Sequence, residues 1–95
     1  MKNNYTLITG ASRGIGKAIT IECASRKMNV LLVSLPNENL EGVSEMIVND
    51  FGVKSDFLEI DLTEYDSPNN VYKWCEKKNY SVNILINNAG IAGTT

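Results

Sequence analysis

Three glycines near the N-terminus, Gly10, Gly14 and Gly16, have the type and spacing to hold an anion. They lie in the segment TLITGASRGIGKAI, between an apolar run and a segment with helical periodicity. A helix N-terminus has backbone N–H groups without intrahelical partners and a partial positive charge, so it stabilises an anion that comes close. Glycine leaves room for that approach and adopts the backbone angles of the turn. The pattern favours a site for a diphosphate, and a tight turn without a ligand is the alternative.

The spacing of these glycines, G-x-x-x-G-x-G, differs from the common dinucleotide fingerprint G-x-G-x-x-G. Three glycines alone are a weak signal. Their surroundings add weight, because an apolar run precedes them, an amphipathic segment follows, and a second apolar run comes next along the chain. We therefore expect a ligand at this turn.

The elements that must position this turn alternate along the chain. Short apolar runs predict strands at residues 5–9, 30–34, 55–60 and 82–87. Helical spacing of apolar residues predicts helices at residues 15–27 and 38–51 and from residue 67 onward. Strand, helix and strand with short connections form parallel β-α-β units, and the runs VLLV and ILI are apolar throughout, as in strands buried on both faces. The chain is predicted to be an α/β protein with helices covering a parallel sheet.

Each predicted helix has one apolar face. The faces consist of Ile15, Ala18, Ile19 and Cys23 in the first helix, Leu40, Val43, Met46, Ile47 and Phe51 in the second, and Val71, Trp74 and Cys75 in the third. Ser67 can cap the third helix, with Pro68 at its first position. Gly52 follows the second helix as a stop signal.

The composition is that of an ordinary globular chain of 95 residues, 43% hydrophobic and 21% charged. A net charge of −2 leaves no basic surface for nucleic acid. No apolar run approaches the about 18 residues that span a membrane, and no signal peptide is recognisable, so we expect a cytoplasmic protein without membrane contact. Two cysteines and no histidine favour buried, reduced thiols over a disulfide or a metal site.

Two motifs together, TGASRGIG at residues 9–16 and NNAG at residues 87–90, resemble the short-chain dehydrogenase/reductase family. The resemblance covers the whole chain and implies a nicotinamide-dependent oxidoreductase with a Rossmann-type fold, a parallel sheet with flanking helices. Residues 1–95 would be the N-terminal part of a single NAD(P)-binding domain. This part would hold four strands and three helices of a larger doubly wound domain, with the catalytic half absent from the sequence.

The resemblance also implies roles for particular residues. The residues that would contact the diphosphate and the adenosine ribose are Gly10, Ser12, Arg13, Ile15 and Gly16, with Gly14 shaping the turn between them. Asp61 and Leu62, after the third strand, would meet the adenine. A turn or capping carboxylate is the alternative for Asp61.

The second motif would lie beneath the adenosine half of the cofactor. Ala89 and Gly90 are small enough for a close approach, and Asn87 and Asn88 would tie neighbouring strands together as well as bind the ligand. Ile91 would lie near the nicotinamide ribose.

The choice between NADP and NAD depends on the end of the second strand. An NAD site places a carboxylate there for the ribose hydroxyls, whereas an NADP site places Arg or Lys beside the 2′-phosphate. Ser34 occupies the acid's position, and Arg13 can reach a 2′-phosphate, so we expect NADP, with NAD as the alternative. Leu35, where NADP-preferring members often have Arg, weakens that expectation, and Glu38 would supply a ribose acceptor if its loop folds back.

The family reduces carbonyl groups with a Tyr whose phenol is acidified by a Lys four residues later. The residues four positions after Tyr5, Tyr65, Tyr72 and Tyr80 are Thr9, Asn69, Glu76 and Ile84, so no Tyr-x-x-x-Lys exists here and no catalytic residue is assigned. We expect the cofactor-binding part of an enzyme that acts on a carbonyl or alcohol substrate. The alternatives are a non-catalytic dinucleotide-binding or partner-binding module that ends naturally at Thr95, and a remnant without a ligand.

The last predicted strand has a consequence for assembly. In this fold it lies inside the sheet, so a chain that stops at Thr95 leaves its far edge unpaired. We expect the isolated chain to be marginally stable or to associate through that edge, and the protein to form a homo-oligomer.

Overall fold

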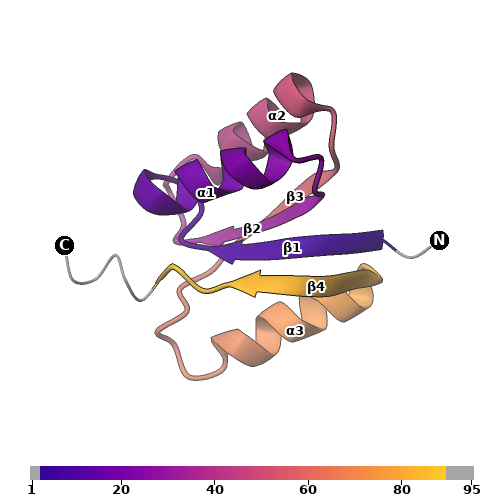
Figure 1. The fold of residues 1–95 in the computed structure, drawn as a ribbon. Helices are drawn as coiled ribbons and strands as arrows, with labels where there is room; N and C mark the ends of the chain where they lie inside the picture. The colour runs from indigo at the N-terminus through magenta and orange to yellow at the C-terminus, as the bar shows by residue number, and fades with distance from the viewer. Residues whose placement is uncertain (1–2, 90–95) are drawn as a thin grey trace.

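The computed structural model describes residues 3–89, which form a parallel sheet with helices on both faces (Figure 1). The elements in chain order are β1 (Asn3–Thr9), α1 (Gly14–Ser25), β2 (Val30–Ser34), α2 (Leu40–Phe51), β3 (Ser55–Glu59), α3 (Ser67–Lys77) and β4 (Tyr80–Ile86). The predicted fold class and the order of its elements are confirmed. Gly52 ends α2 in the left-handed conformation, with φ of 72°, as its sequence position predicts.

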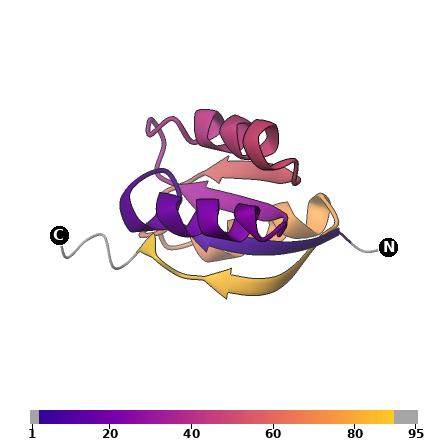
Figure 2. The same cartoon turned by 45° about the horizontal axis from the view of Figure 1, so that its top comes forward.

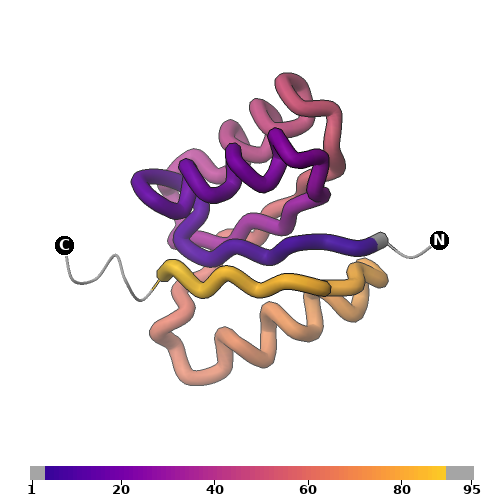
Figure 3. The backbone as a smooth tube through the Cα atoms, viewed as in Figure 1, coloured from indigo at the N-terminus to yellow at the C-terminus, as the bar shows by residue number. Residues whose placement is uncertain are grey.

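The strand order is β3-β2-β1-β4, with every neighbouring pair parallel. β1 pairs with β2 from Thr6 opposite Val30 onward, and with β4 on its other side, where Ile8 is opposite Ile86. Figure 2 shows β4 along one edge of the sheet, and Figure 3 shows the first and last strands of the chain running side by side. This order brings the ends of β1, β2 and β4 to one side of the molecule.

Two apolar clusters hold the helices against the sheet, and consecutive strand residues contribute to opposite ones. Ile8, Val30 and Leu32 belong to the cluster under α1 and α2. Leu7 and Leu31 belong to the cluster under α3. All five residues of β2 are buried, which confirms the prediction for the VLLV run.

The buried face of α1 agrees with the predicted one at Cys23 and Ile19, which pack in the core, and differs from it at the other two positions. Ile15 is 62% exposed and Ala18 is also exposed, whereas the buried residues of α1 are Gly16, Thr20, Cys23 and Ala24. The reason is that Gly16 packs directly against the backbone at the end of β1, which turns its own face of the helix toward the sheet. The hydroxyl of Thr20 is buried on this face but keeps a hydrogen bond, because it donates to the carbonyl of Gly16 at 2.9 Å.

Helix ends also differ from the predicted ones. α1 stops at Ser25 because Lys27 adopts the left-handed conformation, with φ of 67°. α2 starts at Leu40 because Asn39 is left-handed as well, with φ of 56°. Ser67 is not a cap but the first residue of α3, and its hydroxyl donates to the carbonyl of Asp61 at 2.5 Å.

β4 is more exposed than its apolar sequence predicts. Val82, Ile84 and Leu85 are 39%, 45% and 63% exposed. They lie on an edge strand, because no strand among residues 3–89 pairs with the side of β4 that faces away from β1. The expected unpaired edge is therefore present in this part of the chain.

Both cysteines, Cys23 and Cys75, are buried and free, in agreement with the prediction. Within residues 3–89, His, Cys, Asp and Glu side chains form no group of three that could hold a metal ion. None of the described helices is long and apolar enough to cross a membrane.

Candidate functional site

The glycine loop, residues 10–13, joins the end of β1 to the start of α1. Gly10 and Gly14 have φ of 65° and 57°, in the left-handed region that favours glycine. A Cβ on Gly14 would meet nothing within 4 Å, so this residue forms the turn and leaves open space in front of it. The role of Gly14 in the turn is thus the one that the sequence predicts.

Gly10 and Gly16 pack against each other and against the segment after β4. A Cβ on Gly16 would overlap the carbonyl oxygen of Gly10 and fall 2.6 Å from its carbonyl carbon and 2.7 Å from Asn88 Nδ2. A Cβ on Gly10 would fall 2.9 Å from the same nitrogen and 3.2 Å from the Cα of Ala89. The start of α1 therefore touches bare backbone, which requires glycine at both positions.

Thr9, the last residue of β1, links that strand to the segment after β4. Its Oγ1 accepts hydrogen bonds from the N–H groups of Asn88, at 2.8 Å, and Ala89, at 3.0 Å. The same hydroxyl donates to Asn87 Oδ1 at 3.0 Å, and Asn88 Nδ2 donates to the carbonyl of Gly10 at 3.3 Å. These bonds agree with the predicted tying of strands by Asn87 and Asn88. The sequence pattern does not point to Thr9, although this residue directly precedes the first glycine.

The N-terminus of α1 opens beside this arrangement. Arg13 precedes the first turn in an extended conformation, with φ of −159° and ψ of 172°, and no side chain in the described part of the chain caps the helix. The first turn also contains no acidic residue. Free N–H groups and the positive end of the helix dipole therefore coincide with the space in front of Gly14, and this combination fits a phosphate group.

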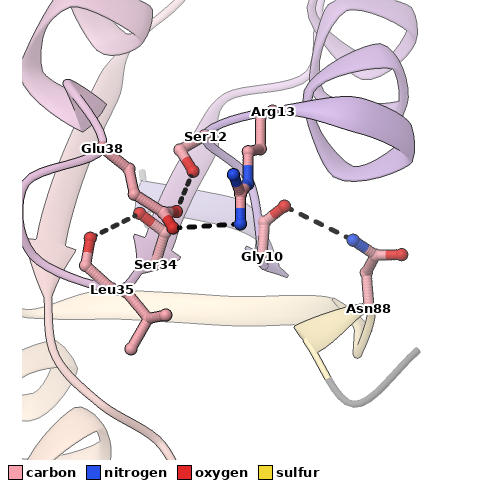
Figure 4. Close-up of polar contacts among 7 residues, drawn as sticks. All are labelled: Gly10, Ser12, Arg13, Ser34, Leu35, Glu38 and Asn88. Atoms are coloured by element: carbon pink, nitrogen blue, oxygen red, sulfur yellow. Dashed lines mark hydrogen bonds and ion pairs between the residues drawn. The ribbon is translucent and has the colours of Figure 1, made fainter. Parts of the chain in front are cut away.

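Glu38 lies at the same loop, although it comes from the connection between β2 and α2. Its carboxylate accepts a hydrogen bond from the hydroxyl of Ser12 and lies 3.6 Å from the guanidinium of Arg13 (Figure 4). Asn37 and Asn39, on either side of it, are left-handed, with φ of 68° and 56°. The loop after β2 therefore folds back and brings the carboxylate of Glu38 to the glycine loop. This is the arrangement that the sequence analysis raised for a ribose acceptor.

Ser34, at the end of β2, is buried, and its hydroxyl donates to the neighbouring carbonyl of Leu35 at 3.3 Å. Leu35 is exposed. Ile15, on the first turn of α1, is exposed beside the loop. Gly90 and Ile91 lie outside the described residues.

Asp61 and Leu62 follow β3, next to the buried end of β2. Asp61 Oδ1 accepts hydrogen bonds from the hydroxyl of Thr63, at 2.7 Å, and from its N–H, at 2.9 Å. The hydroxyl bond and then the backbone bond lower the pKa of Asp61, because both stabilise the ionised carboxylate. The bonds are those of a turn carboxylate, the alternative raised for this residue. Leu62 packs into the cluster under α3, and contact of the pair with adenine stays a prediction.

The sequence model of the family described as short chain dehydrogenase matches residues 4–95. The chain therefore belongs to the short-chain dehydrogenase family. It is 34% identical over 91 residues to the 3-oxoacyl-acyl-carrier-protein reductase FabG of Aquifex aeolicus. That match covers 96% of this chain but only 37% of the relative, so the chain spans well under half the length of that protein.

Solved structures share the fold. The L-sorbose reductase of Gluconobacter frateurii, solved with NADPH and L-sorbose, superposes with a TM-score of 0.80 at 24% identity, over 88% of this chain and 32% of the other. A short-chain dehydrogenase of Sphingobium yanoikuyae, solved in complex with NADPH, superposes with a TM-score of 0.71 at 27% identity, over 83% of this chain and 32% of the other. The described strands and helices thus form part of the Rossmann-type fold of these two proteins.

Proposed function

We propose that residues 1–95 are the cofactor-binding part of an oxidoreductase that transfers hydride between NADP(H) or NAD(H) and a carbonyl or alcohol substrate. This proposal rests on one observation: the N-terminus of α1 has no side-chain cap, and the close packing of Gly16 on Gly10 holds it at the end of β1. A phosphate there meets N–H groups, a helix dipole and no obstructing side chain.

The residues proposed to hold the cofactor lie on several connections. The glycine-loop set is Gly10, Ser12, Arg13, Gly14, Ile15 and Gly16, and the others are Ser34, Asp61, Leu62, Asn88, Ala89 and Gly90. The bound nicotinamide would supply or accept the hydride. The chain's own residues would bind the diphosphate at the start of α1 and orient the ribose beside Arg13 and Ser34.

We propose NADP(H) as the preferred cofactor. Arg13 supplies an exposed cation beside the loop, and Ser34 replaces the acid that an NAD site would place after β2. The Sphingobium relative was solved with NADPH, which supports this choice.

Hydride transfer by this chain would depend on groups that it does not contain, because its sequence has no Tyr-x-x-x-Lys. In the proposed enzyme the proton donor would therefore belong to a part of the protein other than residues 1–95. The same observation favours a second candidate function, a dinucleotide-binding module that transfers no hydride.

Calorimetric titration of the chain with NADPH, and separately with NADH, tests cofactor binding. Gly14→Asp would place a carboxylate at the N-terminus of α1, where it competes with a phosphate for the same N–H groups. The substitution also strains the left-handed backbone at this position, which has φ of 57°. Gly52→Asp is the matched control, because Gly52 is also left-handed with open space around it but ends α2. We expect Gly14→Asp to weaken binding at least about tenfold and Gly52→Asp to retain it. Absence of binding by the unchanged chain would contradict the proposal.

A further inference from the structure

The carboxylate of Glu38 binds the two polar groups that would otherwise bind a 2′-phosphate, the hydroxyl of Ser12 and the guanidinium of Arg13. It accepts a hydrogen bond from Ser12 and pairs with Arg13, the cation on which the preference for NADP(H) rests. The side chain of Glu38 is only 20% exposed, whereas that of Arg13 is 79% exposed. Glu38 is therefore the fixed member of the pair, and Arg13 is the member that has freedom to move.

The two cofactors differ in how they would meet this carboxylate. A ribose 2′-hydroxyl is a hydrogen-bond donor and can donate to it. A 2′-phosphate is an anion that accepts hydrogen bonds, so it would face a like charge and would have to take Arg13 and Ser12 away from Glu38.

We infer that Glu38 holds Arg13 back from a 2′-phosphate and thereby narrows the preference of this chain for NADP(H) over NAD(H). The inference rests on the proposed function, and it assigns to Glu38 a role in selecting the cofactor. Glu38→Gln removes the negative charge, keeps the side-chain length and retains an oxygen that accepts from Ser12. This variant frees Arg13 and should strengthen binding of the 2′-phosphate.

The test compares two probes that contain only the adenosine half of the cofactor, adenosine 2′,5′-bisphosphate and adenosine 5′-monophosphate. Calorimetry gives the ratio of their affinities for the unchanged chain and for Glu38→Gln. We expect the ratio to rise about tenfold in favour of the bisphosphate in the variant. Glu41→Gln, an exposed residue in the first turn of α2, is the matched control and should leave the ratio unchanged.

Arg13→Gln extends the test to the mechanism, and its exposed side chain makes it a safe substitution for folding. If Glu38 acts through Arg13, Glu38→Gln should change the ratio much less in the Arg13→Gln background. An equal effect in both backgrounds would overturn the inference, as would a ratio that Glu38→Gln leaves unchanged or lowers. Binding of neither probe and neither dinucleotide by the unchanged chain would overturn the proposed function as well, so the two failures are distinguishable.

Discussion

Gly14 and Gly16 are glycines for different physical reasons. Gly14 has a left-handed backbone and open space around it, whereas Gly16 lies within α1 and contacts the backbone of Gly10. Gly14→Ala should cost about 1–2 kcal/mol through backbone strain alone. Gly16→Ala should cost about 3 kcal/mol or more, because the methyl group would overlap the backbone carbonyl of Gly10, which cannot swing aside as a side chain can. Urea unfolding of the two variants checks the order, and equal costs would contradict the contact between the two glycines.

The hydroxyl of Thr9 should contribute to stability through the two backbone N–H groups that it accepts. Thr9→Val keeps the shape of the side chain but leaves the N–H groups of Asn88 and Ala89 without this acceptor. We expect a loss of about 2 kcal/mol in the free energy of unfolding. Thr63→Val, at an exposed turn, is the control and should cost less. A loss for Thr9→Val no larger than for the control would show that the link is weak.

At the residue scale the sequence predicts the residues of the glycine loop and raises the possible return of Glu38 to it, but misses Thr9. The spacing of Gly10, Gly14 and Gly16 indicates a turn at the start of a helix, and the structure has one. Thr9 and Glu38 gain their importance from contacts across about 80 and 26 residues of sequence. Local pattern carries no information on such contacts, although the possibility that Glu38 folds back could be stated.

At the scale of the elements, the position of β4 at the edge of the described sheet leads to a prediction about assembly. Val82, Ile84 and Leu85 expose apolar surface along an edge strand, which favours pairing with a second chain. The 95-residue chain should therefore self-associate, and Leu85→Lys should reduce that association by placing a charge on the edge. Val48→Lys removes exposed apolar surface from α2 instead and should leave association unchanged. Sedimentation velocity measures the association state of the unchanged chain and of the two variants. An unchanged chain that is monomeric would contradict the prediction.

The elements themselves could be predicted because apolar periodicity determines most of them. The bounds of β2 agree with the prediction, and α2 buries the predicted Leu40, Val43 and Ile47. The face of α1 could be predicted only in part, since Cys23 packs in the core but the buried face also includes Gly16 and Thr20, which are not apolar residues. The exposure of β4 could not be read from its own residues either, because it depends on which strands flank it.

For the molecule as a whole, Tyr80 of β4 connects the two edges of the described sheet. Its hydroxyl donates to Asp56 of β3, and its ring packs on Tyr5 with centroids 4.6 Å apart. Burial, followed by the hydrogen bond to Asp56 and the charge of that residue, raises the pKa of Tyr80. Lys78 also faces Asp56, at 3.6 Å, and burial together with Asp56 raises the pKa of Tyr5.

This connection predicts alkaline sensitivity. Above about pH 10 a tyrosine in the unfolded chain releases its proton while Tyr80 in the folded chain retains it, so the unfolded state binds fewer protons and stability falls as pH rises. Below that pH the stabilising contribution is fully present. Tyr80→Phe should lower stability at pH 8 and reduce its slope between about pH 9 and 11, with Tyr72→Phe, an exposed tyrosine, as control. Denaturant unfolding across this range checks both effects, and an unchanged slope would contradict the role of Tyr80.

The hydrogen bonds of Thr9 also bear on the order in which a ribosome makes the site. Thr9 is synthesised about 80 residues before Asn88 and Ala89, whose amides fix its hydroxyl. β1, β2 and β3 with their two helices are synthesised before α3 and β4. The glycine loop meets Asn88 only after β4 has been added. The binding loop therefore cannot reach its final geometry until the chain has been made through Ala89.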